Sequence, residues 1–341
     1  MSAPSSTARY VAVDVGAESG RVLLGTLAGG RIALDELHRF ANEPLQLADG
    51  LHWDVERIER EILHGLSVAG GLGVPIDGIA VDAWGCDYAL LDRGGTLLGA
   101  PFHYRDRRTD GVVEQVVEQL GRERLYAATG IQLLPFNTLF QLVAECDGPR
   151  LAAAATLLTI PDLLAFRLSG RIVAERTVAS TTQLLDVHSG AWARPLLAEL
   201  GLPDAILPPL VDAGTPLAPL RPELAAAAGL DPVPQVIAVG AHDTASAVVA
   251  VPREAAYISS GTWSLVGLEL DAPVTSAGAL AANVTNERGV GGTIRLLRNV
   301  MGLWLVQECR RAWERAGSPY DYAGLSALAA SAPAGGPLID P

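Results

Sequence analysis

Near its N-terminus the chain reads YVAVDVGAESGRVLLGTL over residues 10–27. Two apolar runs flank a short polar turn that has a glycine at each end, Gly16 and Gly20. Apolar runs separated by a glycine-bounded turn predict a β-hairpin, with strands at residues 10–15 and 21–27. Asp14 lies close to the end of the first strand, beside the turn.

The second half of the chain repeats this pattern as AAYISSGTWSLVGL over residues 255–268. The predicted strands here span residues 255–259 and 263–268, with a turn that contains Gly261 and Thr262. Two similar hairpins, each opening one half of the chain, indicate a duplicated fold with a cleft between two lobes. The alternative is two ordinary hairpins in unrelated sheets, because short patterns recur by chance.

The other segments alternate between apolar strand patterns and helical spacing, which predicts an α/β protein. Residues 203–234 are rich in Pro and Ala and are expected to connect the lobes, with a boundary near residues 235–240. Asp54 is placed to cap the first helix. Further strands are expected at residues 31–40, 78–83 and 235–239, a hairpin at 90–98, and helices at 54–69, 110–120, 138–145, 162–168, 245–250 and 301–313.

The charge composition excludes several functions. The chain has 341 residues, of which 38 are acidic and 25 basic, all of the latter arginine, and its formal net charge is −13. Without lysine there is no P-loop, no protein-kinase phosphate lysine and no Schiff-base nucleophile. The acidic balance argues against a nucleic-acid partner, because neutralising phosphates supplies most of that affinity.

Length and cysteine content indicate the general class of protein. A chain of 341 residues exceeds the size at which single cores stop growing, so two domains are expected. Cys86, Cys146 and Cys309 are far apart, which argues against disulfides or structural zinc and fits a reducing cytoplasm. Residues 1–9 do not resemble a signal peptide, and no stretch is both long and apolar enough to span a membrane. A cytoplasmic protein without a membrane partner is expected.

The first hairpin contains one candidate site. Asp14 suits a hydrated Mg²⁺, which prefers carboxylates, waters and substrate phosphates, and the alternative is a carboxylate that caps its own turn. The backbone N–H groups of residues 16–20 can bind phosphate oxygens without any lysine. Arg21 either adds positive charge there or is a surface residue. Glu18 must point away from the phosphates or face the metal, because a carboxylate repels them.

A second candidate site follows the strand at residues 235–239. Asp243 fits two roles there: a general base that accepts a proton from a substrate hydroxyl, or the N-cap of the next helix. The segment alone favours capping, and His242 alone is more often structural than catalytic. Residues 84–87 (WGCD) suit either a sugar or a plain turn, and Asn299 either caps the following helix or binds a ligand.

Six motifs occur in a fixed order along the chain: DVGAESGR (14–21), WGCD (84–87), HYRDRRTDG (103–111), HDTASA (242–247), YISSGTWSL (257–265) and NVMGLWLVQE (299–308). Together they resemble the FGGY family of carbohydrate kinases, and within it the branch that acts on L-rhamnulose. The resemblance extends from residue 10 to about residue 310 and implies a two-lobe actin-like, ribonuclease H-like fold with mixed sheets. Glu18 departs from the Ser or Thr that is common across the wider family.

The resemblance also implies an activity and roles for individual residues. The activity is transfer of the ATP γ-phosphoryl group to the 1-hydroxyl of L-rhamnulose, with Asp243 as proton acceptor. Asp14 is then the residue that faces hydrated Mg²⁺. The implied sugar contacts are Gly85, His242, Asp243, Thr244 and Asn299, and the implied nucleotide contacts are Ala17, Glu18, Ser19, Gly20, Arg21, Thr262 and Gln307.

Members of this family continue well beyond Pro341, so the resemblance implies an incomplete second lobe that lacks its adenosine-binding part. It divides the chain into a sugar- and phosphate-binding lobe at residues 1–238 and a partial lobe at 239–341 that carries the base and the second hairpin. Two alternatives stay open: a non-catalytic sugar-binding or regulatory relic, and a kinase for another ketose such as L-fuculose or xylulose. The sequence does not predict the oligomeric state.

Overall fold

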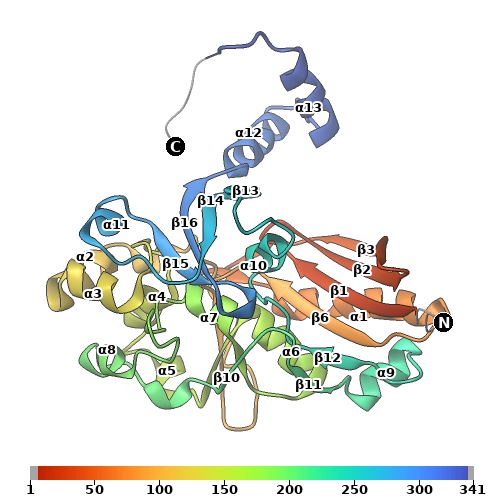
Figure 1. Ribbon diagram of the computed structural model, residues 1–341, viewed down its shortest axis with the longest axis horizontal. Helices are drawn as coiled ribbons and strands as arrows, with labels where there is room; N and C mark the ends of the chain where they lie inside the picture. Colours follow the sequence, from red (N-terminus) through yellow and green to blue (C-terminus); the bar gives the residue numbers. More distant parts are fainter. Residues whose placement is uncertain (1–6, 337–341) are drawn as a thin grey trace.

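The computed structural model describes residues 7–336 of the chain and confirms an α/β architecture (Figure 1). The strands are β1 (Ala8–Val15), β2 (Ser19–Ala28), β3 (Arg31–Ala41), β4 (Pro44–Leu47), β5 (Gly50–Trp53), β6 (Gly78–Ala83), β7 (Tyr88–Leu91), β8 (Thr156–Thr159), β9 (Ala174–Glu175), β10 (Leu210–Val211), β11 (Pro216–Pro219), β12 (Gln235–Ile237), β13 (Tyr257–Ser260), β14 (Trp263–Leu270), β15 (Thr285–Arg288) and β16 (Ile294–Met301). The α-helices are α1 (Val55–Gly71), α2 (Val112–Leu120), α3 (Arg122–Thr129), α4 (Thr138–Ala144), α5 (Pro149–Ala153), α6 (Ile160–Ser169), α7 (Arg176–Thr181), α8 (Arg194–Glu199), α9 (Pro222–Ala228), α10 (Asp243–Val248), α11 (Ala277–Ala281), α12 (Trp304–Arg315) and α13 (Tyr322–Ser331).

A six-stranded mixed sheet forms the first part of the molecule, in the order β11-β12-β6-β1-β2-β3. The predicted hairpin is confirmed as the antiparallel pair β1 and β2, and β6 runs parallel to β1 on its other side. Strand β12 then pairs in parallel with β6, although it lies far along the chain. The carboxyl ends of β1, β6 and β12 therefore meet at one edge of the sheet.

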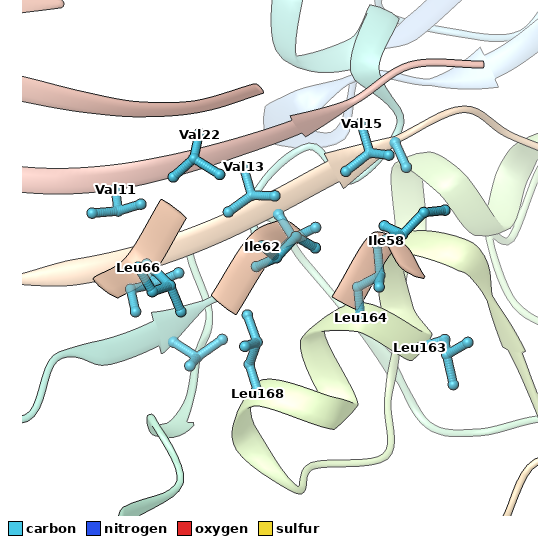
Figure 2. Packing of buried hydrophobic residues seen from close by; sticks show 14 of the residues in the cluster. Val11, Val13, Val15, Val22, Ile58, Ile62, Leu66, Leu163, Leu164 and Leu168 are labelled. Carbon is cyan, nitrogen blue, oxygen red and sulfur yellow. The ribbon is translucent and has the colours of Figure 1, made fainter. Parts of the chain in front are cut away.

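Apolar side chains from this sheet and two helices form one core (Figure 2). In α1 the buried residues Ile58, Ile62 and Leu66 are four positions apart, the spacing that places side chains on one helix face. They pack between the inward-facing valines of β1 and the leucines of α6. The Asp54 carboxylate caps α1, as predicted, by accepting a hydrogen bond from the Arg57 backbone N–H at 2.9 Å.

The second predicted hairpin is also confirmed. Strands β13 and β14 pair antiparallel and continue into a four-stranded sheet in the order β13-β14-β16-β15. Helices α12 and α13 follow this sheet and extend away from the rest of the molecule in Figure 1. Within residues 7–336, none of the helices has the length and apolar character that crossing a membrane requires.

One sequence prediction was incomplete, and two need correction. The expected hairpin at residues 90–98 forms an antiparallel bridge between Leu91 and Leu97, but β7 also pairs along its whole length with β8, which lies far away in sequence and was not predicted. The Pro- and Ala-rich segment at 203–234 is not a connector between lobes: β11 extends the large sheet beside β12, and α9 packs against α1. The last predicted helix begins at Trp304 rather than residue 301, because Met301 is still paired in β16.

Candidate active site

The predicted site residues come together around a single cleft with a volume of about 970 Å³. Its walls contain both hairpin turns, the ends of β1 and β6, and the start of α10. The predicted residues that line it are Asp14, Ala17, Glu18, Ser19, Arg21, Gly85, His242, Asp243, Thr244, Thr262, Asn299 and Gln307. Gly20 is the exception: it is buried, and a side chain there would overlap the ring of Phe40.

The first hairpin turn is held in shape by backbone hydrogen bonds. The Gly16 N–H donates to the Ser19 carbonyl at 2.9 Å, and the Asn42 side-chain amide donates to the Gly16 carbonyl at 2.8 Å. The Asn42 N–H in turn donates to the Glu18 carbonyl at 2.8 Å. The turn is thus fixed by the residue that follows β3, and Ala17, Glu18 and Ser19 face the cleft.

Asp14 is paired with Arg21, its direct neighbour across β1 and β2. The Arg21 Nε donates to Asp14 Oδ2 at 3.1 Å, and one Nη donates to the same oxygen. The carboxylate therefore does not cap its own turn. Around it, the described residues hold no group of three or more His, Cys, Asp or Glu side chains that would form a dedicated metal cage.

Asp82 is a cleft residue that sequence reasoning missed. It is the register partner of Asp14 across the parallel strands β1 and β6, so the two carboxylates lie side by side. Its Oδ1 is buried and has no hydrogen-bond partner among the described residues. Burial, together with the negative charges of Asp14 and Asp243, raises the pKa of Asp82 well above its ordinary value.

Asp243 is the first residue of α10, and its side chain is 34% exposed to the cleft. Its Oδ1 accepts hydrogen bonds from the Thr244 N–H at 2.5 Å and the Thr244 hydroxyl at 3.1 Å. Enclosure in the cleft raises the pKa of Asp243 above the ordinary value, although His242 and Thr244 oppose this. The N-cap position belongs to His242, whose side chain makes no capping bond, so the capping interpretation of Asp243 was wrong.

Long-range contacts fix the position of this loop. Ala83, at the end of β6, forms a parallel bridge with His242, and the Ala83 N–H donates to the Ala241 carbonyl at 2.9 Å. On the other side, buried Glu175 accepts from the Ala241 N–H at 3.0 Å through Oε2. The ends of β6 and β12 therefore deliver Gly85 and Asp243 to the same cleft.

The predicted nucleotide and sugar contacts in the second sheet and in α12 are held in place by hydrogen bonds. Gln307 of α12 donates from Nε2 to the Thr262 hydroxyl in the second hairpin turn at 3.3 Å. Asn299 of β16 donates from its backbone N–H and its side-chain amide to Gln132 Oε1, at 2.9 and 3.2 Å. Gln132 also lines the cleft and was not predicted, because it occurs in no motif and reaches Asn299 only through folding.

Within the WGCD motif, the glycine and the carboxylate have different roles. A Cβ on Gly85 would lie 2.6 Å from the Thr181 hydroxyl, so glycine permits a close approach there. Asp87 is fully buried and accepts hydrogen bonds from the indole N–H groups of Trp53 and Trp84, at 2.6 and 3.0 Å. Burial raises the pKa of Asp87 to about 6. This carboxylate therefore holds the wall of the cleft together and does not face a sugar.

Two models of one protein family together match most of the chain. Residues 10–250 match the N-terminal domain of the FGGY family of carbohydrate kinases, and residues 256–341 match its C-terminal domain. The chain belongs to the FGGY family of carbohydrate kinases. The division after residue 238 stays a prediction.

Two relatives from this family are similar to nearly the whole chain. The chain is 49% identical to the rhamnulokinase of Pectobacterium carotovorum subsp. carotovorum over 339 residues, which cover 97% of this chain and 66% of the relative. It is 45% identical to the rhamnulokinase of Enterococcus faecalis, again over 97% of this chain and 67% of the relative. The chain thus spans about two thirds of the length of the curated relatives it matches.

Solved structures show the same fold. The xylulose kinase of Lactobacillus acidophilus superimposes with a TM-score of 0.80 at 19% identity, covering 96% of this chain and 66% of that one. A carbohydrate kinase from Novosphingobium aromaticivorans superimposes with a TM-score of 0.74 at 27% identity, covering 87% and 63%. The predicted actin-like sugar-kinase fold is therefore confirmed.

Proposed function

We propose that this chain is the larger part of an ATP-dependent kinase that phosphorylates L-rhamnulose at its 1-hydroxyl. The observation that carries the proposal is the placement of Asp243. Its Oδ1 is held by Thr244, while Oδ2 receives no hydrogen bond from the described residues and is available to a sugar hydroxyl. A carboxylate with a raised pKa is a stronger base, which suits proton acceptance from that hydroxyl.

The two hairpins support the placement of ATP on the opposite side of the same cleft. The turn at Ala17, Glu18 and Ser19 and the turn at Thr262 both line the cleft that contains Asp243. Phosphoryl transfer depends mainly on positioning and charge stabilisation, with one residue that orients the nucleophile. Arg21 adds a positive charge, and glycine-containing turns supply backbone N–H groups.

The same proposal includes a hydrated Mg²⁺ held by Asp14, with Asp82 beside it. Mg²⁺ keeps several waters and takes one or two carboxylates in addition to substrate phosphates, so a dedicated cage is not required. The buried, unpartnered Oδ1 of Asp82 is consistent with an oxygen-rich pair of ligands at this edge of the sheet. When bound, the ion would neutralise charge on the phosphates.

The choice of L-rhamnulose comes from the relatives, which are named rhamnulokinases. Polar groups that read each hydroxyl discriminate strongly against analogues that leave them unpaired. We expect Asn299 and Gln132 to contribute to this selection, because both line the cleft and contact each other. The cytoplasmic location also stays a prediction, since it comes from the pattern of cysteines.

A coupled ADP-release assay tests the proposal. L-rhamnulose, L-fuculose and xylulose are compared as substrates for this chain and for the product of the complete coding sequence, and the highest kcat/KM is expected for L-rhamnulose. Asp243→Asn should lower kcat by about 10²–10⁴, whereas the control Asp271→Asn, at a side chain that is 91% exposed, should not change it. Full activity of Asp243→Asn would contradict the assigned base. Tight sugar binding without binding of an ATP analogue, measured by calorimetry, would instead favour a non-catalytic relic.

A further inference from the structure

A buried ion pair lies directly behind His242. Glu287 of β15 and Arg295 of β16 are register partners across the two strands. The Arg295 Nη2 donates to Glu287 Oε2 at 3.0 Å, and Arg295 is 0% exposed. Burying such a pair costs free energy relative to apolar residues of similar size, so stability alone is a weak reason for its presence.

Both charged groups contact the same nitrogen of His242. Its Nδ1 lies 3.0 Å from the Arg295 Nη2 and 3.3 Å from the Glu287 Oε2. A guanidinium group keeps its protons and offers only donors. Since Nη2 is the nearer atom and must donate, Nδ1 accepts, and the proton of the neutral ring lies on Nε2.

The position of this proton determines whether His242 faces Asp243 with an N–H group or with a lone pair. The Nε2 atom lies 3.4 Å from Asp243 Oδ1, the oxygen that Thr244 also holds. An N–H on this side attracts the carboxylate, whereas a lone pair would repel it. Burial alone would raise the pKa of Glu287, but the charge of Arg295 opposes burial and helps to hold it below the ordinary value, so Glu287 stays ionised and keeps Arg295 in place.

We propose that Arg295, held by Glu287, is a positioning residue that fixes His242 with its proton on Nε2 and thereby orients the Asp243 carboxylate. The inference rests on the proposed function for its catalytic consequence, since Asp243 is the base of that reaction. Neither Glu287 nor Arg295 belongs to a motif of the sequence, and Arg295 does not line the cleft. Its effect on Asp243 passes through the imidazole ring.

The position of the proton is measured by long-range ¹H–¹⁵N NMR of the histidine rings in the 341-residue chain. The chain contains six histidines, and the His242→Gln spectrum identifies the signals of His242. We expect protonated Nε2 and unprotonated Nδ1 in the wild type. In Arg295→Met the donor to Nδ1 is lost, and we expect the proton to move to Nδ1, where it faces Glu287. A wild-type ring with its proton on Nδ1, or an unchanged spectrum in Arg295→Met, would overturn the inference.

A second variant keeps the test valid if Arg295→Met fails to fold, because that substitution leaves Glu287 buried without its partner. Arg295→Met/Glu287→Leu removes both charges and keeps apolar volume, a change that buried ion pairs tolerate. In this double variant we expect His242 to populate both tautomers. The matched control is Arg253→Met/Asp271→Leu, which removes an exposed ion pair of 2.5 Å and should leave the His242 signals unchanged.

Kinetics of the same variants separate positioning from binding. We expect the double variant at Arg295 and Glu287 to lower kcat at least about tenfold, with the sugar KM changed less than about threefold, because the base is misplaced and the sugar contacts stay. Arg295→Lys, which keeps a donor and a charge, should recover part of the loss. A tautomer change with unaltered kcat would overturn the positioning role. If the product of the complete coding sequence has no kinase activity, the proposed function fails, while the NMR result still decides the assignment of the proton.

Discussion

The ring of Phe40 occupies the space in which any side chain on Gly20 would lie. The two residues are register partners across β2 and β3, so the ring covers the glycine directly. Phe40 is buried in the core beneath the first hairpin. The glycine that ends this turn is therefore required for packing, whereas its neighbours Ser19 and Arg21 line the cleft.

Gly20→Ala is expected to destabilise the protein by about 1–3 kcal/mol, because the added methyl group forces Phe40 out of its position. Urea unfolding measures the change. Gly71→Ala is the control, since that glycine is the last residue of α1 and a Cβ added to it would have no neighbouring atom within 4 Å. Adding Phe40→Leu to Gly20→Ala should recover part of the loss. Equal unfolding midpoints for Gly20→Ala and the wild type would contradict this account of the turn.

The buried carboxyl of Asp162 predicts a pH dependence of stability. Burial raises the pKa of Asp162 to about 8, although hydrogen bonds from Thr159 and the Glu175 N–H oppose the shift. The folded state thus keeps a proton that the unfolded chain releases near pH 4. The stabilisation is complete below that pH and is lost as pH rises through about 8, by at most about 1.4 kcal/mol per pH unit.

Asp162→Asn removes this dependence, because the amide stays neutral at every pH. Urea unfolding between pH 5 and pH 8 should show the variant gaining stability relative to the wild type as pH rises. Asp271→Asn, at an exposed position, should follow the wild type at each pH. Parallel curves for the wild type and Asp162→Asn would sink the prediction.

Arg105 contacts three aromatic rings, which belong to its neighbour Tyr104, to β14 and to α12. Its guanidinium lies 4.2 Å from the ring centroid of Trp304, 5.5 Å from that of Trp263 and 5.1 Å from that of Tyr104. Cation–π contacts of this kind contribute about 0.5–2 kcal/mol. Arg105→Ala should therefore increase amide hydrogen exchange in residues 103–106 and in α12. The control Arg107→Ala, at a side chain that is 91% exposed, should not. Unchanged hydrogen exchange in Arg105→Ala would show that these cation–π contacts do not stabilise residues 103–106 and α12.

An apolar strip is exposed on the second sheet. Ile258 and Val266 are register partners on β13 and β14, and they are 68% and 45% exposed. Contiguous apolar surface of this kind promotes association. Sedimentation velocity of the 341-residue chain should therefore detect self-association that Ile258→Thr/Val266→Thr reduces. Ile172→Thr, at an exposed position elsewhere, is the control. A wild-type chain that stays monodisperse at all concentrations would refute the prediction.

Local patterns were sufficient for both hairpins and for α1, because turn chemistry and helical spacing act over a few residues. The role of Asp243 is different, since its segment fits a cap as well as a base. Only long-range contacts remove Asp243 from the N-cap position: Ala83 and Glu175 hold the loop from distant strands, and the backbone they position places His242 at the N-cap. The role of Asp243 as a base stays a prediction. The role of base comes only from the family resemblance that the six motifs carry together.

Residues outside motifs were missed for the same reason. Asp82 lies within an apolar strand pattern, and only its register with Asp14 places it at the cleft. Glu287 and Arg295 are separated by a turn and meet by cross-strand pairing. The predicted hairpin at residues 90–98 forms, but the longer pairing of β7 with β8 was missed because β8 lies far away in sequence.

The position of β12 beside β6 has a consequence for synthesis of the protein. Strand β6 is complete at residue 83, but its free edge is covered only when residues 235–237 have left the ribosome. At ordinary translation rates this interval is roughly 8–30 s. During that time a parallel edge rich in apolar residues has no partner strand, and non-local parallel pairing is slow. The nascent chain is therefore expected to need a chaperone until residues 235–237 emerge.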